Sequence, residues 1–176
     1  MRPIATFLTV AVTTLLGACA NRPAAPAPLK ATAVLESRSG SNVTGRVELT
    51  EKAGQVRAHV ELAGLAPNSE HGFHIHDKGD CSAADASSAG GHYNPAGASH
   101  GRAGIPPHHA GDLPSLTADA SGNVGADVLV DGVTLAPGPT SIVGRSLVVH
   151  RDRDDFATQP AGNAGPRLAC GVIAQR

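Results

Sequence analysis

The order of apolar and polar residues predicts short strands joined by turns. Residues 55–62 alternate strictly between apolar and polar side chains, which is the period-two pattern of a strand with one buried face, and this places His59 on the solvent side. Residues 31–37 and 42–50 are predicted strands, and residues 51–54 form a predicted hairpin turn. No segment has apolar residues at the i, i+3, i+4, i+7 spacing of an amphipathic helix.

After a long interruption, further strands are predicted at residues 115–118, 123–130, 146–150 and 168–173, with a turn at 119–123. The composition agrees, because 21 glycines and 13 prolines favour turns over helices. With three phenylalanines and one tyrosine in the chain, the core must be built from Val, Leu, Ile and Ala. These features predict one all-β domain, either a sandwich or a barrel.

Residues 1–18 have the features of an export signal. Their apolar run, residues 4–16, is too short to span a bilayer comfortably and fits the core of a signal peptide. It leads into Leu-Gly-Ala-Cys, which resembles the bacterial lipobox and implies cleavage before Cys19 and lipid attachment to its thiol. An ordinary signal peptide with an incidental cysteine is the alternative. Ala20 favours retention in the outer membrane of a Gram-negative cell.

Residues 19–29 form a predicted Pro/Ala-rich linker, and residues 30–176 form the predicted folded domain. This organisation predicts a protein of the periplasm or cell envelope, held to a membrane by a lipid. The formal net charge of −1 and the lack of a basic patch in the sequence exclude a typical nucleic-acid binder.

Seven of the nine histidines lie in residues 71–112. His74 and His76 are two apart in a strand-like segment, so their imidazoles point the same way and can hold one metal ion. The rest of this segment is a long loop rich in Gly, Pro, Ala and Ser, which is uncommon inside a compact domain unless it is functional. The loop carries four further candidate ligands, at intervals of eight, nine and three residues: His92, His100, His109 and Asp112.

Two cysteines, Cys81 and Cys170, lie in the predicted domain. An even pair in an exported domain predicts a disulfide, because oxidised pairs persist outside the cytosol. Two free buried thiols are the alternative. The disulfide would close a loop of about 90 residues and tie the long loop to the last predicted strand.

Several motifs together resemble the copper–zinc superoxide dismutases, from about residue 30 to the C-terminus. They occur in the family's order: Gly72-Phe-His-Ile-His76, Gly91-His-Tyr-Asn-Pro95, His109-Ala-Gly-Asp-Leu113, Leu147-Val-Val-His150 and Gly162-Asn-Ala-Gly-Pro-Arg-Leu-Ala-Cys-Gly-Val172. The Cys81 segment and the lipoprotein signal are similar to bacterial members. The resemblance implies an eight-stranded Greek-key β-barrel or flattened sandwich with long metal-binding and electrostatic loops, which agrees with the strand pattern.

The resemblance also implies one copper and one zinc per chain. Copper would be bound by four histidines: His74, His76, His92 and His150. Zinc would be bound by His92, His100, His109 and Asp112, with the imidazole of His92 shared between the metals. Arg167 would stand at the mouth of the copper site, and Asp154 would bridge histidines of the two sites. The residue types agree, because imidazole suits copper and three histidines with one carboxylate form a closed zinc site.

The implied activity is dismutation of superoxide to dioxygen and hydrogen peroxide at copper, with His92 as the proton carrier and Arg167 as the anion guide. Two alternatives use the same chain: a non-catalytic copper- or zinc-binding lipoprotein, and a structural lipoprotein domain with a degenerate site. The intact ligand set argues against the latter, and Arg167 argues against a carrier. His71 is assigned a structural role, His109 is preferred to His108 as a ligand, and the choice between monomer and homodimer stays open.

Overall fold

The computed structural model describes residues 27–176, so the predicted signal, Cys19 and the first part of the linker lie outside the described residues. Ten strands and one 3-10 turn make up the regular structure of this part. They are β1 (Leu29–Ser37), β2 (Thr44–Lys52), β3 (Gln55–Ala63), β4 (Glu70–His71), β5 (Phe73–His76), η1 (Ser87–Ala89), β6 (Leu116–Thr117), β7 (Val124–Val130), β8 (Ser146–His150), β9 (Arg167–Val172) and β10 (Ala174–Gln175).

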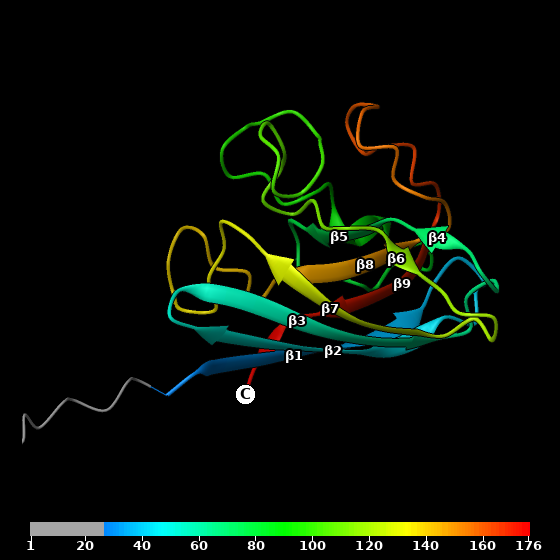
Figure 1. Cartoon of the computed structure of the whole chain (residues 1–176), viewed down its shortest axis with the longest axis horizontal. Helices are drawn as coiled ribbons and strands as arrows, with labels where there is room; N and C mark the ends of the chain where they lie inside the picture. The colour runs from blue at the N-terminus through cyan, green and yellow to red at the C-terminus, as the bar shows by residue number, and fades with distance from the viewer. Residues whose placement is uncertain (1–26) are drawn as a thin grey trace, which may run out of the picture.

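The main sheet is antiparallel and curls into two facing layers (Figure 1). Its strand order is β5-β8-β9-β1-β2-β3-β7, with β10 also paired to β1. Strand β1 belongs to both layers. Its residues from Leu29 to Leu35 pair with β2, whereas Glu36 and Ser37 pair with β9. The connections from β3 to β5 and from β7 to β8 pass from one layer to the other, which is the Greek-key pattern. The all-β prediction is confirmed.

The hairpin between β2 and β3 is tighter than the sequence pattern predicts. Lys52 pairs with Gln55, so the loop contains only Ala53 and Gly54, both at positive φ of 52° and 78°. A two-residue turn of this kind matches the twist of the two strands and lets pairing continue to the tip. Strand β2 therefore runs to Lys52 and begins at Thr44, two residues later at each end than predicted.

The core is built from small aliphatic side chains, as the composition predicts. Strand β3 alternates buried and exposed along its whole length, and Val56, Ala58 and Val60 are fully buried. Each fully buried aliphatic side chain of valine size or larger contributes roughly 1.5–3 kcal/mol. His59 lies on the outer face of the same strand, as predicted, with its Nδ1 3.1 Å from Asp127 Oδ1 on β7.

Strand β5 joins the core to the histidine-rich region. All four of its residues are buried, although Phe73 and Ile75 belong to the apolar core and His74 and His76 point to the opposite face. Two long loops, green and orange in Figure 1, project from the same side of the barrel over this face. The free edge of β5 is covered by the green loop, because Tyr93 N–H donates to Ile75 O at 2.8 Å.

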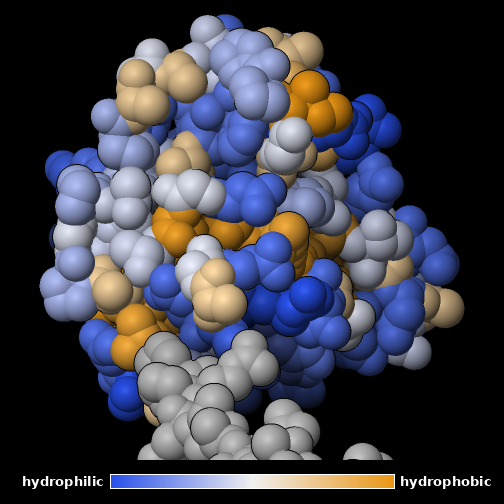
Figure 2. All heavy atoms as spheres, turned by 60° about the vertical axis from the view of Figure 1, so that its left-hand side comes forward, coloured by the Kyte–Doolittle hydropathy of each residue, from blue (hydrophilic) through white to orange (hydrophobic). Residues whose placement is uncertain are grey.

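The surface turned forward in Figure 2 is largely hydrophilic, with apolar side chains visible mainly as a band between polar ones. This arrangement is expected where the end of a barrel closes over an apolar core. No helix in residues 27–176 has the length and apolar character needed to cross a membrane.

Cys81 and Cys170 form a disulfide with a Cα–Cα distance of 5.7 Å, so this prediction is confirmed. Cys170 is buried on β9 in a small apolar cluster with Ala86, Ala89 and Val148. The bond therefore fastens the start of the green loop, which has little apolar surface of its own, to the central strands.

Replacing both cysteines, as Cys81→Ser with Cys170→Ala, is expected to lower the free energy of unfolding by about 4–5 kcal/mol, because it releases a loop of 89 residues in the unfolded chain. Urea unfolding of the variant and the parent, both stripped of metal, measures this difference. A midpoint equal to that of the parent would contradict a stabilising role for the bond.

Candidate metal centre

The first cluster consists of four histidines, each of which places one ring nitrogen within 4.8 Å of the others: His74, His76, His92 and His150. Three of them are held by backbone pairing. His74 and His76 lie on β5, which pairs with β8, and His150 is the last residue of β8, just past a register shift. His92 is brought to the cluster by an isolated bridge to His76.

Backbone carbonyls fix the ring orientation of two of these histidines. His76 Nδ1 donates to Gly90 O at 2.9 Å, and His150 Nδ1 donates to Gly165 O at 3.0 Å. A carbonyl oxygen can only accept, so the proton lies on Nδ1 and the lone pair on Nε2. The two Nε2 atoms face each other at 3.3 Å, which leaves two lone pairs in close contact unless a cation lies nearby.

The second cluster is formed around one oxygen of Asp112. Its Oδ1 lies 2.8 Å from His92 Nδ1, 3.0 Å from His100 Nδ1 and 3.1 Å from His109 Nδ1. The other oxygen accepts the backbone N–H groups of Gly101 and His109, which fixes the carboxylate plane. Three imidazole nitrogens and one carboxylate oxygen thus converge on a single point, as a tetrahedral metal site requires.

His92 belongs to both clusters through its two ring nitrogens. Three buried side-chain atoms of residues 27–176 have no hydrogen-bond partner, and two of them are His74 Nδ1 and His92 Nε2. The rings of these two histidines lie with their centroids 4.0 Å apart. A buried ring nitrogen without a partner is costly, so both nitrogens fit the role of ligands to a cation in the four-histidine cluster.

The carboxylate of Asp154 links the two clusters from the inside of the protein. Its Oδ2 accepts a hydrogen bond from His74 Nε2 at 2.8 Å, and its Oδ1 accepts one from His100 Nε2 at 2.9 Å. Both side chains and the carboxylate are fully buried. Burial alone would raise the pKa of Asp154, but the hydrogen bonds from His100 and His74 hold it well below its ordinary value.

Gly162 leaves the room that this carboxylate needs. The residue has a φ of +61°, and a β-carbon there would collide with Asp154 Oδ1 and lie 2.6 Å from His100 Nε2. Any side chain at this position would therefore push apart the hydrogen bond between Asp154 and His100.

Burial sets the protonation of three histidines in the four-histidine cluster. It lowers the pKa of His74 to about 4, that of His150 to about 3 and that of His76 to about 2. These rings are neutral at neutral pH, as metal ligands must be. His100 behaves differently, because its hydrogen bonds to Asp112 and Asp154 outweigh the effect of burial and raise its pKa to about 9.

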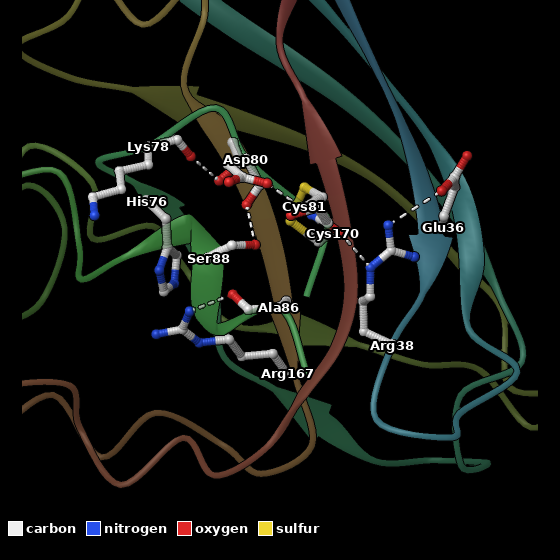
Figure 3. The surroundings of a disulfide bond; sticks show 12 residues. Glu36, Arg38, His76, Lys78, Asp80, Cys81, Ala86, Ser88, Arg167 and Cys170 are labelled. Atoms are coloured by element: carbon white, nitrogen blue, oxygen red, sulfur yellow. Dashed lines mark hydrogen bonds and ion pairs between the residues drawn. A yellow bond between two sulfur atoms is a disulfide. The ribbon is translucent and has the colours of Figure 1, made fainter. Parts of the chain in front are cut away.

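Arg167 stands beside this cluster as the first residue of β9, directly across from His150. Its Nη1 donates to Ala86 O at 2.6 Å (Figure 3). Its Nη2 donates to Gly90 O at 2.7 Å, so two backbone carbonyls of the green loop hold the guanidinium in place. The Gly90 carbonyl thus accepts hydrogen bonds from both Arg167 and His76.

A cavity of about 330 Å³ opens onto the four-histidine cluster. It is lined by His76, Gly91, His92, Asn94, His109, His150, Pro160, Ala161 and Arg167. Three histidines of the cluster and the guanidinium therefore face one space that is large enough for a small anion.

The remaining histidines lie where the sequence analysis places them. His71 is buried, with its Nδ1 2.8 Å from His150 O and its Nε2 2.6 Å from Ser69 Oγ, which is a structural role. His108 points its Nδ1 at His109 O and belongs to neither cluster. The roles of the Gly90 and Gly165 carbonyls could not be predicted from sequence, because a backbone acceptor has no signal in residue type.

Comparison with known proteins agrees with this geometry. The family model described as "Copper/zinc superoxide dismutase (SODC)" matches residues 43–173. Two curated proteins of Aquifex aeolicus, "Superoxide dismutase [Cu-Zn] 2" and "Superoxide dismutase [Cu-Zn] 1", are 44% and 40% identical over 82% of this chain, and cover 86% and 88% of their own lengths. A "Superoxide dismutase [Cu-Zn]" of Candida glabrata is 43% identical over 82% of this chain and 97% of its own.

The structures agree as well. A crystal structure of a double mutant of a SOD-like protein from Bacillus subtilis aligns with a TM-score of 0.75 and 37% identity, over 81% of this chain and 96% of that one. The matched region contains every residue of the two clusters, the disulfide and Arg167. The chain therefore belongs to the copper/zinc superoxide dismutase family, whose cofactors are copper and zinc.

Proposed function

We propose that this protein dismutes superoxide, converting two superoxide anions and two protons into dioxygen and hydrogen peroxide. The observation that carries the proposal is the shared histidine. His92 belongs both to a four-histidine cluster that faces a cavity and to a second cluster built around Asp112.

The donor sets assign the metals. Four imidazole nitrogens suit copper, and the two unpartnered nitrogens, His74 Nδ1 and His92 Nε2, are the ones that a copper ion would satisfy. Three histidines and a carboxylate fill a tetrahedral zinc site completely and leave no position for substrate. The cavity is lined by three of the four proposed copper ligands, and by two of the four proposed zinc ligands, one of which is the shared His92. Turnover is therefore assigned to copper.

Bound copper would supply the one-electron couple, which accepts an electron from one superoxide and returns it to the next. The protein supplies the rest. Arg167 offers a fixed positive charge and N–H donors to the incoming anion, and positive potential at a mouth raises the on-rate of an anion by roughly 10 to 1,000-fold. His92 Nε2 can take up a proton and pass it to the reduced oxygen species, because its Nδ1 stays oriented by the second cluster.

A non-catalytic copper- or zinc-binding lipoprotein is the alternative function. The disposition of Arg167 argues against it, because two hydrogen bonds to carbonyls hold the guanidinium beside the cavity. A carrier of reduced copper also favours sulfur ligands, and both cysteines of residues 27–176 are joined in the disulfide.

We place the protein at the cell envelope, facing the periplasm or the exterior and anchored by a lipid on Cys19, where it would remove superoxide that arises outside the cytoplasm. The support is the lipobox-like sequence and the disulfide, since such bonds persist in oxidising compartments. Globomycin sensitivity of processing and metabolic labelling with palmitate, lost in Cys19→Ala, test the anchor.

His150→Ala is expected to reduce superoxide turnover by at least 100-fold and to remove most of the copper, while zinc stays near one per chain, because His150 belongs to the copper cluster alone. Metal analysis and a turnover assay on one preparation measure both effects. His59→Ala, at an exposed histidine, is the matched control. Full copper loading and no turnover in the parent protein would favour the carrier alternative.

Arg167→Gln is expected to lower kcat/KM for superoxide by about 10-fold or more without changing metal content, because it removes the charge that attracts the anion. The dependence of the rate on ionic strength should weaken in parallel. Arg46→Gln, which changes the same charge on a surface residue of β2 paired with Glu48, should leave the rate unchanged. An equal loss in both variants would point to net charge rather than to this guanidinium.

Zinc affinity of the metal-free protein is expected to rise about tenfold per pH unit from about pH 6 to about pH 8 and to level off near pH 9, because zinc must displace the proton on His100 Nδ1. The same raised pKa means that protonated His100 stabilises the metal-free fold below about pH 6.5, an effect lost as the pH rises through about 9. Competition against a chelator at several pH values measures the affinity. A flat profile over this range would contradict the assignment.

A further inference from the structure

His100 is held in the zinc cluster by an unusual pair of hydrogen bonds. Its backbone N–H donates to Gln159 Oε1 at 2.8 Å, and its backbone C=O accepts from Gln159 Nε2 at 3.0 Å. The side-chain amide of Gln159 therefore pairs with the backbone of His100 in both directions, as a neighbouring strand would. The two residues are 59 positions apart in the chain.

The other ligands are fixed by the fold itself. His74, His76 and His150 lie on paired strands. Tyr93 N–H, next to His92, donates to Ile75 O on β5, and Asp112 makes an isolated bridge to His74 on the same strand. The backbone of His109 is bonded to Asp112 on both sides, by its N–H to the carboxylate and by its C=O to the Asp112 N–H.

His100 has less support of this kind: the N–H of the next residue, Gly101, donates to Asp112 Oδ2, but no strand pairs with His100 itself. It lies in the glycine- and alanine-rich part of the loop, outside any strand, and within residues 27–176 both of its backbone hydrogen bonds go to Gln159. Its ring is oriented by Asp154 through Nε2, and Asp154 comes from the same loop after β8 as Gln159. One loop therefore controls both the ring and the backbone of this ligand.

We propose that Gln159 is a positioning residue of the zinc site, which holds His100 Nδ1 at the metal by clamping the backbone of that residue. The inference rests on the zinc assignment of the proposed function. Ala161 and Pro160, which follow Gln159 directly, line the cavity at copper, so the clamp also joins the backbone of a zinc ligand to the rim of the substrate cavity.

The chain offers a matched control next to the clamp. Thr158 Oγ1 donates to Asp155 Oδ2 at 2.7 Å and accepts from Asn163 Nδ2 at 3.1 Å, so Thr158→Val removes hydrogen bonds from the same loop without touching His100. Gln159 is exposed, and besides its clamp its Nε2 makes one exposed hydrogen bond, to Ala157 O at 3.2 Å. Gln159→Met keeps the length of the side chain and should fold. Gln159→Glu keeps one acceptor for the His100 N–H and loses the donor to its carbonyl.

The experiment follows transfer of zinc to a chelator from the copper- and zinc-loaded full chain, together with the visible spectrum of cobalt placed in the zinc site. Gln159→Met is expected to weaken zinc retention by about 10 to 100-fold, the usual effect of losing a partner that orients a metal ligand, and to change the cobalt bands. Gln159→Glu should fall between Gln159→Met and the parent, Thr158→Val should match the parent, and copper retention should stay unchanged in all three.

Two results would overturn this inference but leave the proposed function standing. The first is zinc retention and cobalt bands in Gln159→Met that equal those of the parent. The second is an equal loss of zinc in Thr158→Val, which would indicate general loosening of the loop. Parent protein that takes up no zinc at all would overturn the proposed function and the inference with it. The spectrum and the chelator assay do not depend on turnover, so they separate these cases.

Discussion

Two buried hydrogen bonds to one carboxylate determine how the metal-binding region is arranged. Asp154 Oδ2 accepts from His74 and Asp154 Oδ1 accepts from His100, so the two clusters share a support in addition to the shared ring of His92. The same bonds hold a proton on Nε2 of each ring, so that a metal bound to either cluster would meet the Nδ1 side of the ring. Without this carboxylate, two buried rings would lose both their orientation and their tautomer.

The fold brings many imidazoles close together without mutual charge repulsion. Six histidines of the two clusters would repel one another if they were charged, and burial removes the water that would screen them. The barrel keeps the rings of His74, His76 and His150 neutral by burial. It places the buried carboxylates of Asp112 and Asp154 where they offset the positive charge of His100. The charge of this region therefore depends on where each ionisable side chain is buried. It does not follow from the formal net charge of the whole chain, which is −1.

Much of this organisation could be predicted from sequence. The alternation in residues 55–62 and the His-x-His pair in β5 have a period of two. The other candidate ligands except His150 lie in a loop of Gly, Pro, Ala and Ser, where histidines stand out. Strands β4 and β10 were missed because two residues cannot establish a period. Gln159 was missed because an exposed glutamine has no sequence signal, and its partner is a backbone 59 residues away that only the folded loop brings near.

The position of Arg167 links the cavity at the four-histidine cluster to the oxidation state of the cysteines. Its two carbonyl acceptors, on Ala86 and Gly90, belong to the segment that the Cys81–Cys170 bond fastens to β9. In a chain whose thiols are reduced, this segment is no longer covalently tied to β9. The histidines on β5 and β8 are still held by the pairing of these two strands. Oxidation of the two thiols therefore restricts the position of the carbonyls that hold the Arg167 guanidinium.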